Sequence, residues 1–430
     1  MALTGRAVIL LLLGLLPTVV WPSATTVRLW WLVVIVAVGL DVLLALSPRR
    51  LEIHREPPGQ VRLGDSGRSV LLVSNPTARR FHGLVRDAWQ PSAGAVGDRH
   101  RVVLPGGERR RLVTLLTPTR RGDRLADTVT VRSLGPLGLA ARQRSLDVPG
   151  HIRALPPFSS RKHLPSRLAM LRQLDGRSAV RTRGQGTEFD SLRDYVEGDD
   201  VRSIDWRATA RRTNVVVRTW QPERDRRVLL VLDTSRVAAA RVGDMPRLDA
   251  AMDAALLLAA LASRAGDRVD LLAGDRRIRA RVSGASRTEL LNDLVSGMAP
   301  LEPALLEADW PLLAGAVTGL SRQRALVVLL TPLEPAAVEE GLLPVLPALA
   351  HQHRVVLASV ADPALAPMAA DRSGVREVYD AAAAERTVAL RQRTAETLRR
   401  MGVEVLDADP EDLPVRLADH YLLLKSQGLL

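Results

Sequence analysis

The chain has 430 residues, of which 47% are hydrophobic and 25% charged, so it is long enough for two or three globular domains. It contains no cysteine, which excludes a disulfide framework, thiolate catalysis and cysteine-ligated zinc or iron–sulfur sites. The net charge of +13 comes from basic residues that are spread along the chain among acidic ones, and aromatic residues make up only 3%. Clustered basic and aromatic residues are typical of nucleic-acid-binding faces, so no nucleic-acid partner is expected.

Two apolar runs, 7–24 and 29–46, occupy the N-terminus. Each has about 18 residues, close to the roughly 20 that a helix needs to cross a membrane. Tryptophans stand near the ends of the runs, where an interfacial aromatic belt is expected. The sequence therefore predicts a two-helix transmembrane hairpin over residues 1–50. Asp41 is costly in lipid, but it lies off-centre and could face the partner helix or reach the interface.

Basic residues flank the predicted hairpin unevenly. Arg6 precedes the first span, Arg28 is the single basic residue of the connection, and Arg49, Arg50 and Arg55 follow the second span. The positive-inside rule then places both ends of the hairpin in the cytoplasm. A cleaved signal peptide is the alternative, but no A-x-A-like cleavage site follows the first run. We expect a multi-pass protein of the plasma membrane with the bulk of the chain in the cytoplasm.

Residues 51–157 are rich in short runs that alternate apolar and polar side chains, separated by Gly, Pro, Asn and Asp. This period of two predicts strands and turns. Several strands at such spacing bury one face against a second sheet, so we predict an all-β, sandwich-like unit. A basic, helix-compatible connector and a segment dense in charge follow over residues 158–226.

From residue 227 to 430 strands alternate with helices. The unbroken apolar run Arg227 to Asp233 predicts a buried parallel strand, and Arg247 to Gly266 a helix that ends at glycine. Further strands are predicted around 324–332 and 353–362. Such alternation indicates a doubly wound α/β sheet, whose ligands bind at the carboxyl ends of the strands.

The most informative segment runs from Gly184 to Ser235. It resembles the signature of the DUF58 family, in which a Gly-x-Gly-x-x-Phe turn and several charged and aromatic positions precede a von Willebrand A-like strand ending in Asp-x-Ser. The matching residues are Gly184, Gly186, Phe189, Arg193, Tyr195, Gly198, Asp199, Asp200, Ile204, Asp205, Trp206, Ala210 and Arg211. The hairpin, the β unit and the α/β domain match the layout of that family, so the resemblance covers essentially the whole chain.

The charges of this segment have an interpretation of their own. Carboxylates and arginines at this density favour a salt-bridge and capping network that fixes a loop. A surface that recognises a partner or a phosphate is a second reading, since the arginine fork suits bidentate contacts with anions. A hydrolytic pair of carboxylates is the third, and no histidine or Ser–His pairing supports it.

Asp233, Ser235 and Val237 follow the first α/β strand. The resemblance implies a Mg²⁺ site here, because von Willebrand A domains hold the ion with an Asp-x-Ser-x-Ser loop, a threonine from a second loop and an aspartate after a later strand. Asp233 and Ser235 match, and Thr288, or Ser286, could supply the third ligand. Val237 has no oxygen, and Thr331-Pro332 stands where the later aspartate is expected. The set is degenerate for an ion that prefers several oxygen ligands, and the alternative is that Asp233 and Ser235 order the loop.

We therefore expect a membrane-anchored scaffold or adaptor, not an enzyme, that binds protein partners and needs no cofactor. The resemblance implies that such proteins work with MoxR-type AAA+ ATPases in protein assembly or activation. A metal-dependent adhesion module or hydrolase is the main alternative, and a nucleic-acid-binding membrane protein is the second.

Overall fold

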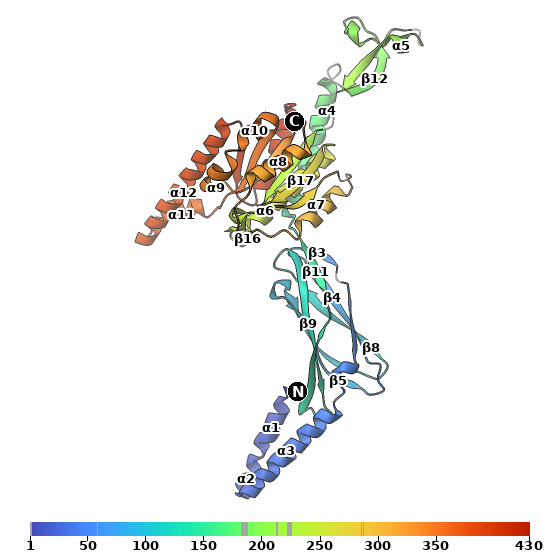
Figure 1. Cartoon of the computed structure of the whole chain (residues 1–430), viewed down its shortest axis with the longest axis vertical. Coiled ribbons are helices and arrows are strands. Elements are labelled where there is room, and N and C mark those ends of the chain that lie inside the picture. The colour runs from blue at the N-terminus through green and yellow to red at the C-terminus, as the bar shows by residue number, and fades with distance from the viewer. Residues whose placement is uncertain are drawn as a thin grey trace. The chain divides into compact units, whose positions relative to one another are not determined.

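The computed structural model describes residues 2–57, 59–181, 188–211, 214–221, 226–284, 286 and 288–430 (Figure 1). The chain divides into two compact units, Met1–Leu155 and Pro156–Leu430. The first unit contains the apolar helices and most of the antiparallel strands, and the second contains a mixed sheet covered by helices.

Three apolar helices open the first unit: α1 (Gly5–Leu13), α2 (Leu15–Val20) and α3 (Ala24–Leu44). Among the described residues α3 is long and apolar enough to cross a membrane, whereas the segment Gly5–Val20 is shorter. The two arms are in contact, because the Trp30 indole donates from Nε1 to the Leu10 carbonyl oxygen over 3.2 Å. A methyl group at Gly14 would clash with the same indole, so the glycine permits the close approach.

Asp41, near the end of α3, is fully buried. Its described hydrogen bonds go to the β unit and not to the partner helix, the first of the two arrangements expected from the sequence. Its carboxylate accepts hydrogen bonds from the backbone amides of Leu137 and Leu139, both at 2.7 Å, and of Ala140 at 2.8 Å. Leu137 and Leu139 belong to the turn between β9 (Gly122–Leu134) and β10 (Ala140–Asp147), and Ala140 is the first residue of β10. A charge that is costly in lipid is thus satisfied by the β unit itself.

The start of the hairpin is tied to the same turn. Strand β1 (Ala2–Leu3) pairs with the first residues of β10, and the amide of Thr4 donates to the carbonyl of Leu139 over 3.0 Å. Both arms therefore begin or end on one β-turn, which fixes the base of the hairpin to the sheet.

Two sheets form the rest of the first unit. One contains β1, β3, β5, β7, β9, β10 and β11, and the other runs in the order β2-β4-β8-β6. A buried cluster takes side chains from both, including Leu71 and Leu112 from one sheet and Phe81, Val102 and Val131 from the other. The remaining bounds are β2 (Glu52–Glu56), β3 (Gln60–Arg62), β4 (Gly67–Ser74), β5 (Phe81–Trp89), β6 (Ala95–Val96), β7 (Arg99–Leu104), β8 (Arg109–Leu116) and β11 (His151–Leu155).

A six-stranded sheet with the order β18-β17-β14-β19-β20-β21 is the centre of the second unit. Strand β18 is antiparallel to β17, and every other neighbouring pair is parallel. The bounds are β14 (Arg227–Asp233), β17 (Arg268–Gly274), β18 (Ile278–Val282), β19 (Leu326–Leu330), β20 (Arg354–Val360) and β21 (Glu404–Ala408). Strand β14 has the bounds predicted from its apolar run.

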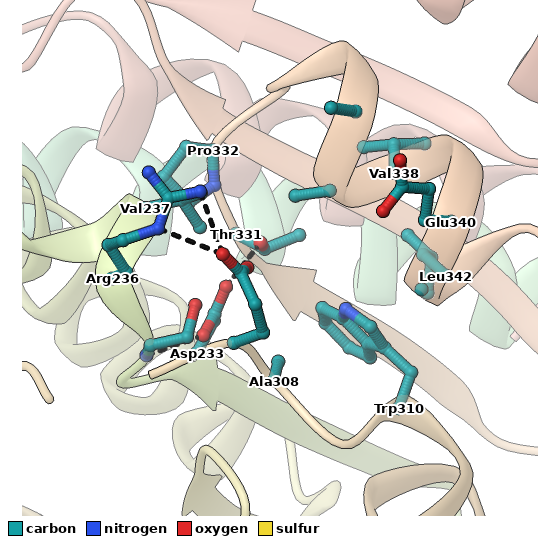
Figure 2. A pocket seen from close by; sticks show the side chains of 15 residues that line it. Asp233, Arg236, Val237, Ala308, Trp310, Thr331, Pro332, Val338, Glu340 and Leu342 are labelled. Carbon is teal, nitrogen blue, oxygen red and sulfur yellow. Dashed lines mark hydrogen bonds and ion pairs between the residues drawn. The ribbon is translucent and has the colours of Figure 1, made fainter. Parts of the chain in front are cut away.

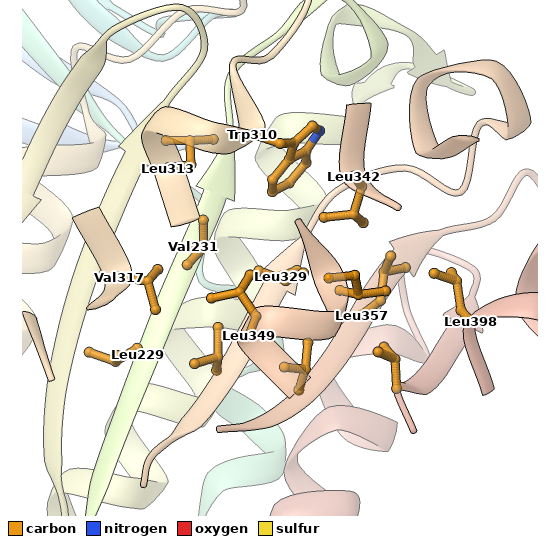
Figure 3. Close-up of a cluster of buried hydrophobic side chains, with 14 of the residues drawn as sticks. Leu229, Val231, Trp310, Leu313, Val317, Leu329, Leu342, Leu349, Leu357 and Leu398 are labelled. Atoms are coloured by element: carbon orange, nitrogen blue, oxygen red, sulfur yellow. The ribbon is translucent and has the colours of Figure 1, made fainter. Parts of the chain in front are cut away.

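Helices cover both faces of this sheet. Helix α6 (Arg247–Arg264) contacts β14, β17 and β20, and α13 (Leu413–Ser426) and α4 (Leu164–Arg181) pack on α6. On the other face, α8 (Trp310–Leu320), α10 (Leu346–Gln352) and α12 (Val375–Arg400) bury alternate residues of the strands (Figure 3). The other helices are η3 (Ser159–His163), η5 (Arg236–Ala239), α7 (Leu290–Met298), α9 (Pro335–Ala337), the π-helical turn η6 (Val338–Leu342) and α11 (Leu365–Ala370).

Removing the Asp41 carboxylate should loosen the base of the hairpin. Asp41→Ala leaves three backbone amides without their acceptor, at a cost of roughly 1–3 kcal/mol for each buried donor. We expect residues 135–142 of the detergent-solubilised protein to exchange amide hydrogens at least about tenfold faster. The matched control is Asp127→Ala, which removes an exposed carboxylate from β9. Equal exchange in wild type and Asp41→Ala would contradict the assignment.

Candidate functional site

The carboxyl ends of β14, β17 and β19 meet at one edge of the six-stranded sheet, because these neighbours are parallel. Asp233 is the last residue of β14, and Asp275 and Thr331 directly follow β17 and β19. The strand order reverses between β14 and β19. In open α/β sheets a reversal of this kind opens a crevice in which ligands bind.

Asp233 is buried at this edge. One carboxylate oxygen accepts from the Thr331 hydroxyl over 2.6 Å, and the other accepts from the Ser235 amide over 2.7 Å. Burial raises the pKa of Asp233, and the hydrogen bonds from Thr331 and Ser235 offset only part of that rise. The Ser235 hydroxyl is buried as well; it makes no hydrogen bond of normal geometry among the described residues, but its proximity to the Asp233 carboxylate also lowers the pKa of Asp233.

Asp275 is a second buried carboxylate that the sequence analysis missed. Its Oδ2 accepts from the Thr234 hydroxyl over 2.9 Å and from Arg279 Nε over 2.8 Å. Burial raises the pKa of Asp275, but the hydrogen bonds and the Arg279 charge outweigh burial, and the net effect is a lowered pKa. Its position in the sequence could have predicted this role, because Asp275 directly follows an apolar strand, just as Asp233 ends one.

A pocket of about 290 Å³ opens beside Asp233 and Ser235 (Figure 2). Its apolar walls include Val237, Trp310 and Leu342, and its charged residues besides Asp233 are Arg236, Glu307 and Glu340. Arg236 is held by Glu307, with Nε 2.8 Å and Nη2 2.7 Å from the same carboxylate oxygen.

The structure places the predicted third metal ligand elsewhere. The Thr288 hydroxyl lies 3.1 Å from that of Ser286, and neither residue lines the pocket. The loop before α8 lies at the edge instead, because the Arg236 amide donates to the Leu306 carbonyl over 2.8 Å. No group of three Asp, Glu or His side chains able to hold an ion occurs in the part of the chain that the structure describes. These residues fit Mg²⁺ poorly, since the ion demands near-octahedral oxygen ligands.

The signature segment forms a separate two-stranded sheet, with β12 (Glu188–Asp194) antiparallel to β13 (Val216–Gln221). Gly184 and Gly186 lie outside the described residues, and Phe189 is placed in β12 by its backbone alone. Between the strands, η4 (Val201–Ser203) and α5 (Trp206–Thr209) fold the connection.

Aspartates fix this connection. Asp199 pairs with both terminal nitrogens of Arg193, at 2.5 and 2.8 Å, and also accepts from the Val196 amide over 2.9 Å. The tight turn needs Gly198, whose φ is +105°. The Arg193 hydrogen bond is the main reason that the pKa of Asp199 is lowered. Asp200 accepts from the Arg202 amide over 3.0 Å at the start of η4.

Asp205 caps α5 by accepting from the amides of Arg207 and Ala208, at 3.0 and 2.9 Å. These and the Arg218 guanidinium, 2.9 Å away, lower its pKa. The ion-pair partner of Asp205 is therefore Arg218, and Arg211 has no ion pair among the described residues. The density of charge in the sequence predicts the network but not which arginine pairs with Asp205.

The same connection exposes large apolar side chains. Trp206 is 66% exposed, Val201 62% and Val196 61%, and Tyr195 is also exposed. Arg202, Arg207 and Arg211 are exposed beside them in sequence. We call these exposed residues of the β12–β13 connection, Tyr195, Val196, Val201, Trp206 and the three arginines, the signature surface.

The raised pKa of Asp233 predicts a pH-dependent cost of folding. The unfolded carboxyl titrates near pH ~3.9. As the pH rises from there through the higher folded pKa, the native protein loses the stability that the protonated form had. Asp233→Asn should lack this loss. The melting temperature of the variant, measured relative to that of wild type, should therefore rise as the pH is raised from about 4 to 8. A difference that is constant with pH, or that moves in favour of wild type, would contradict the burial argument.

Comparison with known proteins identifies a family whose model matches this chain. The family described as "Protein of unknown function DUF58" matches residues 191–408. Uncharacterized proteins of Mycobacterium tuberculosis and Mycobacterium bovis are each 29% identical to this chain over 187 residues, 42% of this chain and 56% of the relative. The chain thus matches little more than half the length of these relatives.

Solved structures show only weak likeness. A fragment of alpha-2-macroglobulin from Escherichia coli is 20% identical over 28% of this chain and 18% of its own, with a TM-score of 0.22. A CARDB domain from Pyrococcus furiosus is 15% identical over 27% of this chain and 90% of its own, with a TM-score of 0.18. The family match covers half of the sequence, including all signature residues from Arg193 onward, and the chain therefore belongs to the DUF58 family.

Proposed function

We propose that this chain is a membrane-anchored scaffold or adaptor that binds a protein partner through its signature surface. The observation that carries the proposal is the 66% exposure of Trp206, a large aromatic side chain within the segment that the family match covers. Tryptophan, tyrosine and arginine are the residues most enriched among the binding hot spots of protein interfaces. The signature surface presents all three types.

The geometry of the surface supports binding. The connection between β12 and β13 is ordered by the Arg193–Asp199 pair and by the hydrogen bonds of Asp205, so Trp206 sits at the start of a capped helical turn. A preordered surface loses little conformational entropy on binding, which favours affinity. Asp199 and Asp205 pair with other arginines, and the exposed Arg202, Arg207 and Arg211 make no ion pair with the described residues, so they can bind acidic groups of the partner.

We assign the second unit, as part of the same proposal, to a doubly wound, von Willebrand A-like domain. In chain order its strands are arranged 3-2-1-4-5-6, the order of doubly wound sheets. The Asp-x-Ser loop after β14 adds to the resemblance. The partner we propose is a MoxR-type AAA+ ATPase, the class of protein that the family resemblance implies. Binding through the signature surface uses neither a metal ion nor a catalytic group.

The membrane arrangement we propose has two spans, α3 and the shorter arm α1–α2, with both soluble ends in the cytoplasm. The charge asymmetry around the hairpin supports it, since the basic residues Arg6, Arg49 and Arg50 lie at its open end.

The topology predicts the behaviour of reporter fusions. An alkaline phosphatase, which is active only outside the cytoplasm, should stay inactive when it is fused after Leu430. A fluorescent protein at the same position should fluoresce. Phosphatase activity there would place the second unit outside and contradict the proposal.

If the signature surface binds the partner, substitution of its exposed tryptophan should weaken that binding. Trp206→Ser in the detergent-solubilised protein should lower the affinity for a purified MoxR-type ATPase roughly thirtyfold, the effect of losing a hot spot of about 2 kcal/mol. The matched control is Tyr379→Ser, which removes an aromatic side chain of similar exposure, 74%, from α12. Binding that is equal in both variants, or absent in wild type, would contradict the proposal.

A further inference from the structure

The pocket at the carboxyl edge of the six-stranded sheet has an unbalanced lining. Three carboxylates line it, Asp233, Glu307 and Glu340, against the single guanidinium of Arg236. Glu307 already holds Arg236 by two contacts to one oxygen. Glu340 is exposed and has no ion-pair or hydrogen-bond partner among the described residues. The uncompensated carboxylate of Glu340 favours a cation in the pocket.

A second and independent observation points into the same pocket. Ser235 lines it, and its buried hydroxyl makes no hydrogen bond of normal geometry with the described residues, although it lies near enough to the Asp233 carboxylate to lower the pKa of that group. Buried hydroxyl groups in proteins are almost always hydrogen-bonded, to protein, water or a ligand. The Ser235 oxygen can accept a hydrogen bond from a donor that enters the pocket.

The walls between these polar groups are apolar. The Trp310 indole, Val338 and Leu342 lie on one side, and Val237 and Pro332 also line the pocket (Figure 2). The carboxylates are not gathered into a cluster that could hold a metal ion. A spread of acceptors along apolar walls fits an elongated organic cation with an aliphatic stem better than a compact ion.

The volume of the pocket further limits the kind of ligand that it can bind. About 290 Å³ lies at the lower end of the range for ligand pockets, so it accommodates one side chain rather than a larger ligand. Arginine presents five donors in a planar fork and stacks on aromatic rings, which matches separated acceptors beside an indole.

We infer that this pocket binds an arginine side chain supplied by a protein partner, with its guanidinium between Ser235 Oγ, Asp233 and Glu340 and its stem along Trp310. None of these residues belongs to the signature surface, so this inference and the proposed function can fail independently of each other.

The absence of cysteine in the wild-type sequence allows a clean reporter. Ala336→Cys places a unique thiol on an exposed residue that lines the pocket. Labelled with a trifluoromethyl group, the detergent-solubilised full chain gives a single ¹⁹F resonance. We expect titration with Nα-acetyl-arginine N-methylamide to shift this resonance, with a dissociation constant on the order of millimolar for so small a ligand. The citrulline analogue, an uncharged isostere, should not shift it, and the same label on Ala382→Cys of α12 should respond to neither.

Matched variants test the contacts. Glu340→Gln should lower the affinity for the arginine probe about tenfold, as expected for the loss of a charge-assisted hydrogen bond. Glu339→Gln makes the same change at an exposed neighbour that does not line the pocket and should leave affinity unchanged. Ser235→Ala should also weaken binding several-fold. If that variant misfolds, the two exposed glutamates still decide the question.

Several results would overturn the inference. No shift with the arginine probe, or an equal shift with citrulline, would show that the pocket does not recognise a guanidinium. An equal loss of affinity in Glu339→Gln and Glu340→Gln would reduce the effect to bulk charge. A shift with Mg²⁺ alone and none with the arginine probe would identify a metal site.

Discussion

The parallel pairing of β14 with β17 and β19 is the constraint on which the candidate site depends. Register places Leu232 beside Ala273 and Leu330, so the residues that follow all leave the sheet at one edge. Asp233, Asp275 and Thr331 are brought together in this way from positions up to 98 residues apart. The apolar cluster on one face and the buried residues of α6 on the other hold the strands in register, and burial then raises the pKa of Asp233. Packing therefore determines the electrostatics of the edge.

In the first unit, the buried carboxylate of Asp41 depends on hydrogen bonds from a single turn. The amides of residues 137–140 supply the hydrogen bonds that Asp41 needs, and the same turn receives β1 and Thr4. A methyl group at Gly135 would lie 2.2 Å from the Asp41 carboxylate, so the turn tolerates no side chain at that position. The base of the apolar hairpin is consequently a fixed part of the β unit rather than a flexible tether.

Local pattern predicted much of the second unit. The unbroken apolar run gave β14 its observed bounds, and the helix predicted from Arg247 ends within two residues of Gly266. The density of charge in the signature segment predicted a network that fixes a loop, which agrees with the capping by Asp200 and Asp205. These features depend on neighbours in sequence, where periodicity and capping rules apply directly.

Contacts between distant segments were not predictable in the same way. Thr288, or Ser286, was expected as a third metal ligand from the family resemblance, but the loop that reaches Arg236 is the one before α8. Nothing in the sequence links Asp41 to a turn almost 100 residues later, or chooses Arg218 over Arg211 as the partner of Asp205. Such choices are made by tertiary packing, which one-dimensional patterns do not encode.

We propose that the signature surface of the DUF58 segment binds another protein at the membrane. Photo-crosslinking in living cells tests it most directly, with the photoreactive amino acid p-benzoylphenylalanine at position 206 and, as a reference, at position 379. We predict that position 206 forms a crosslink to a MoxR-type ATPase that is absent from position 379. Crosslinks from position 206 to lipid or nucleic acid only, or the same products from both positions, would contradict the account.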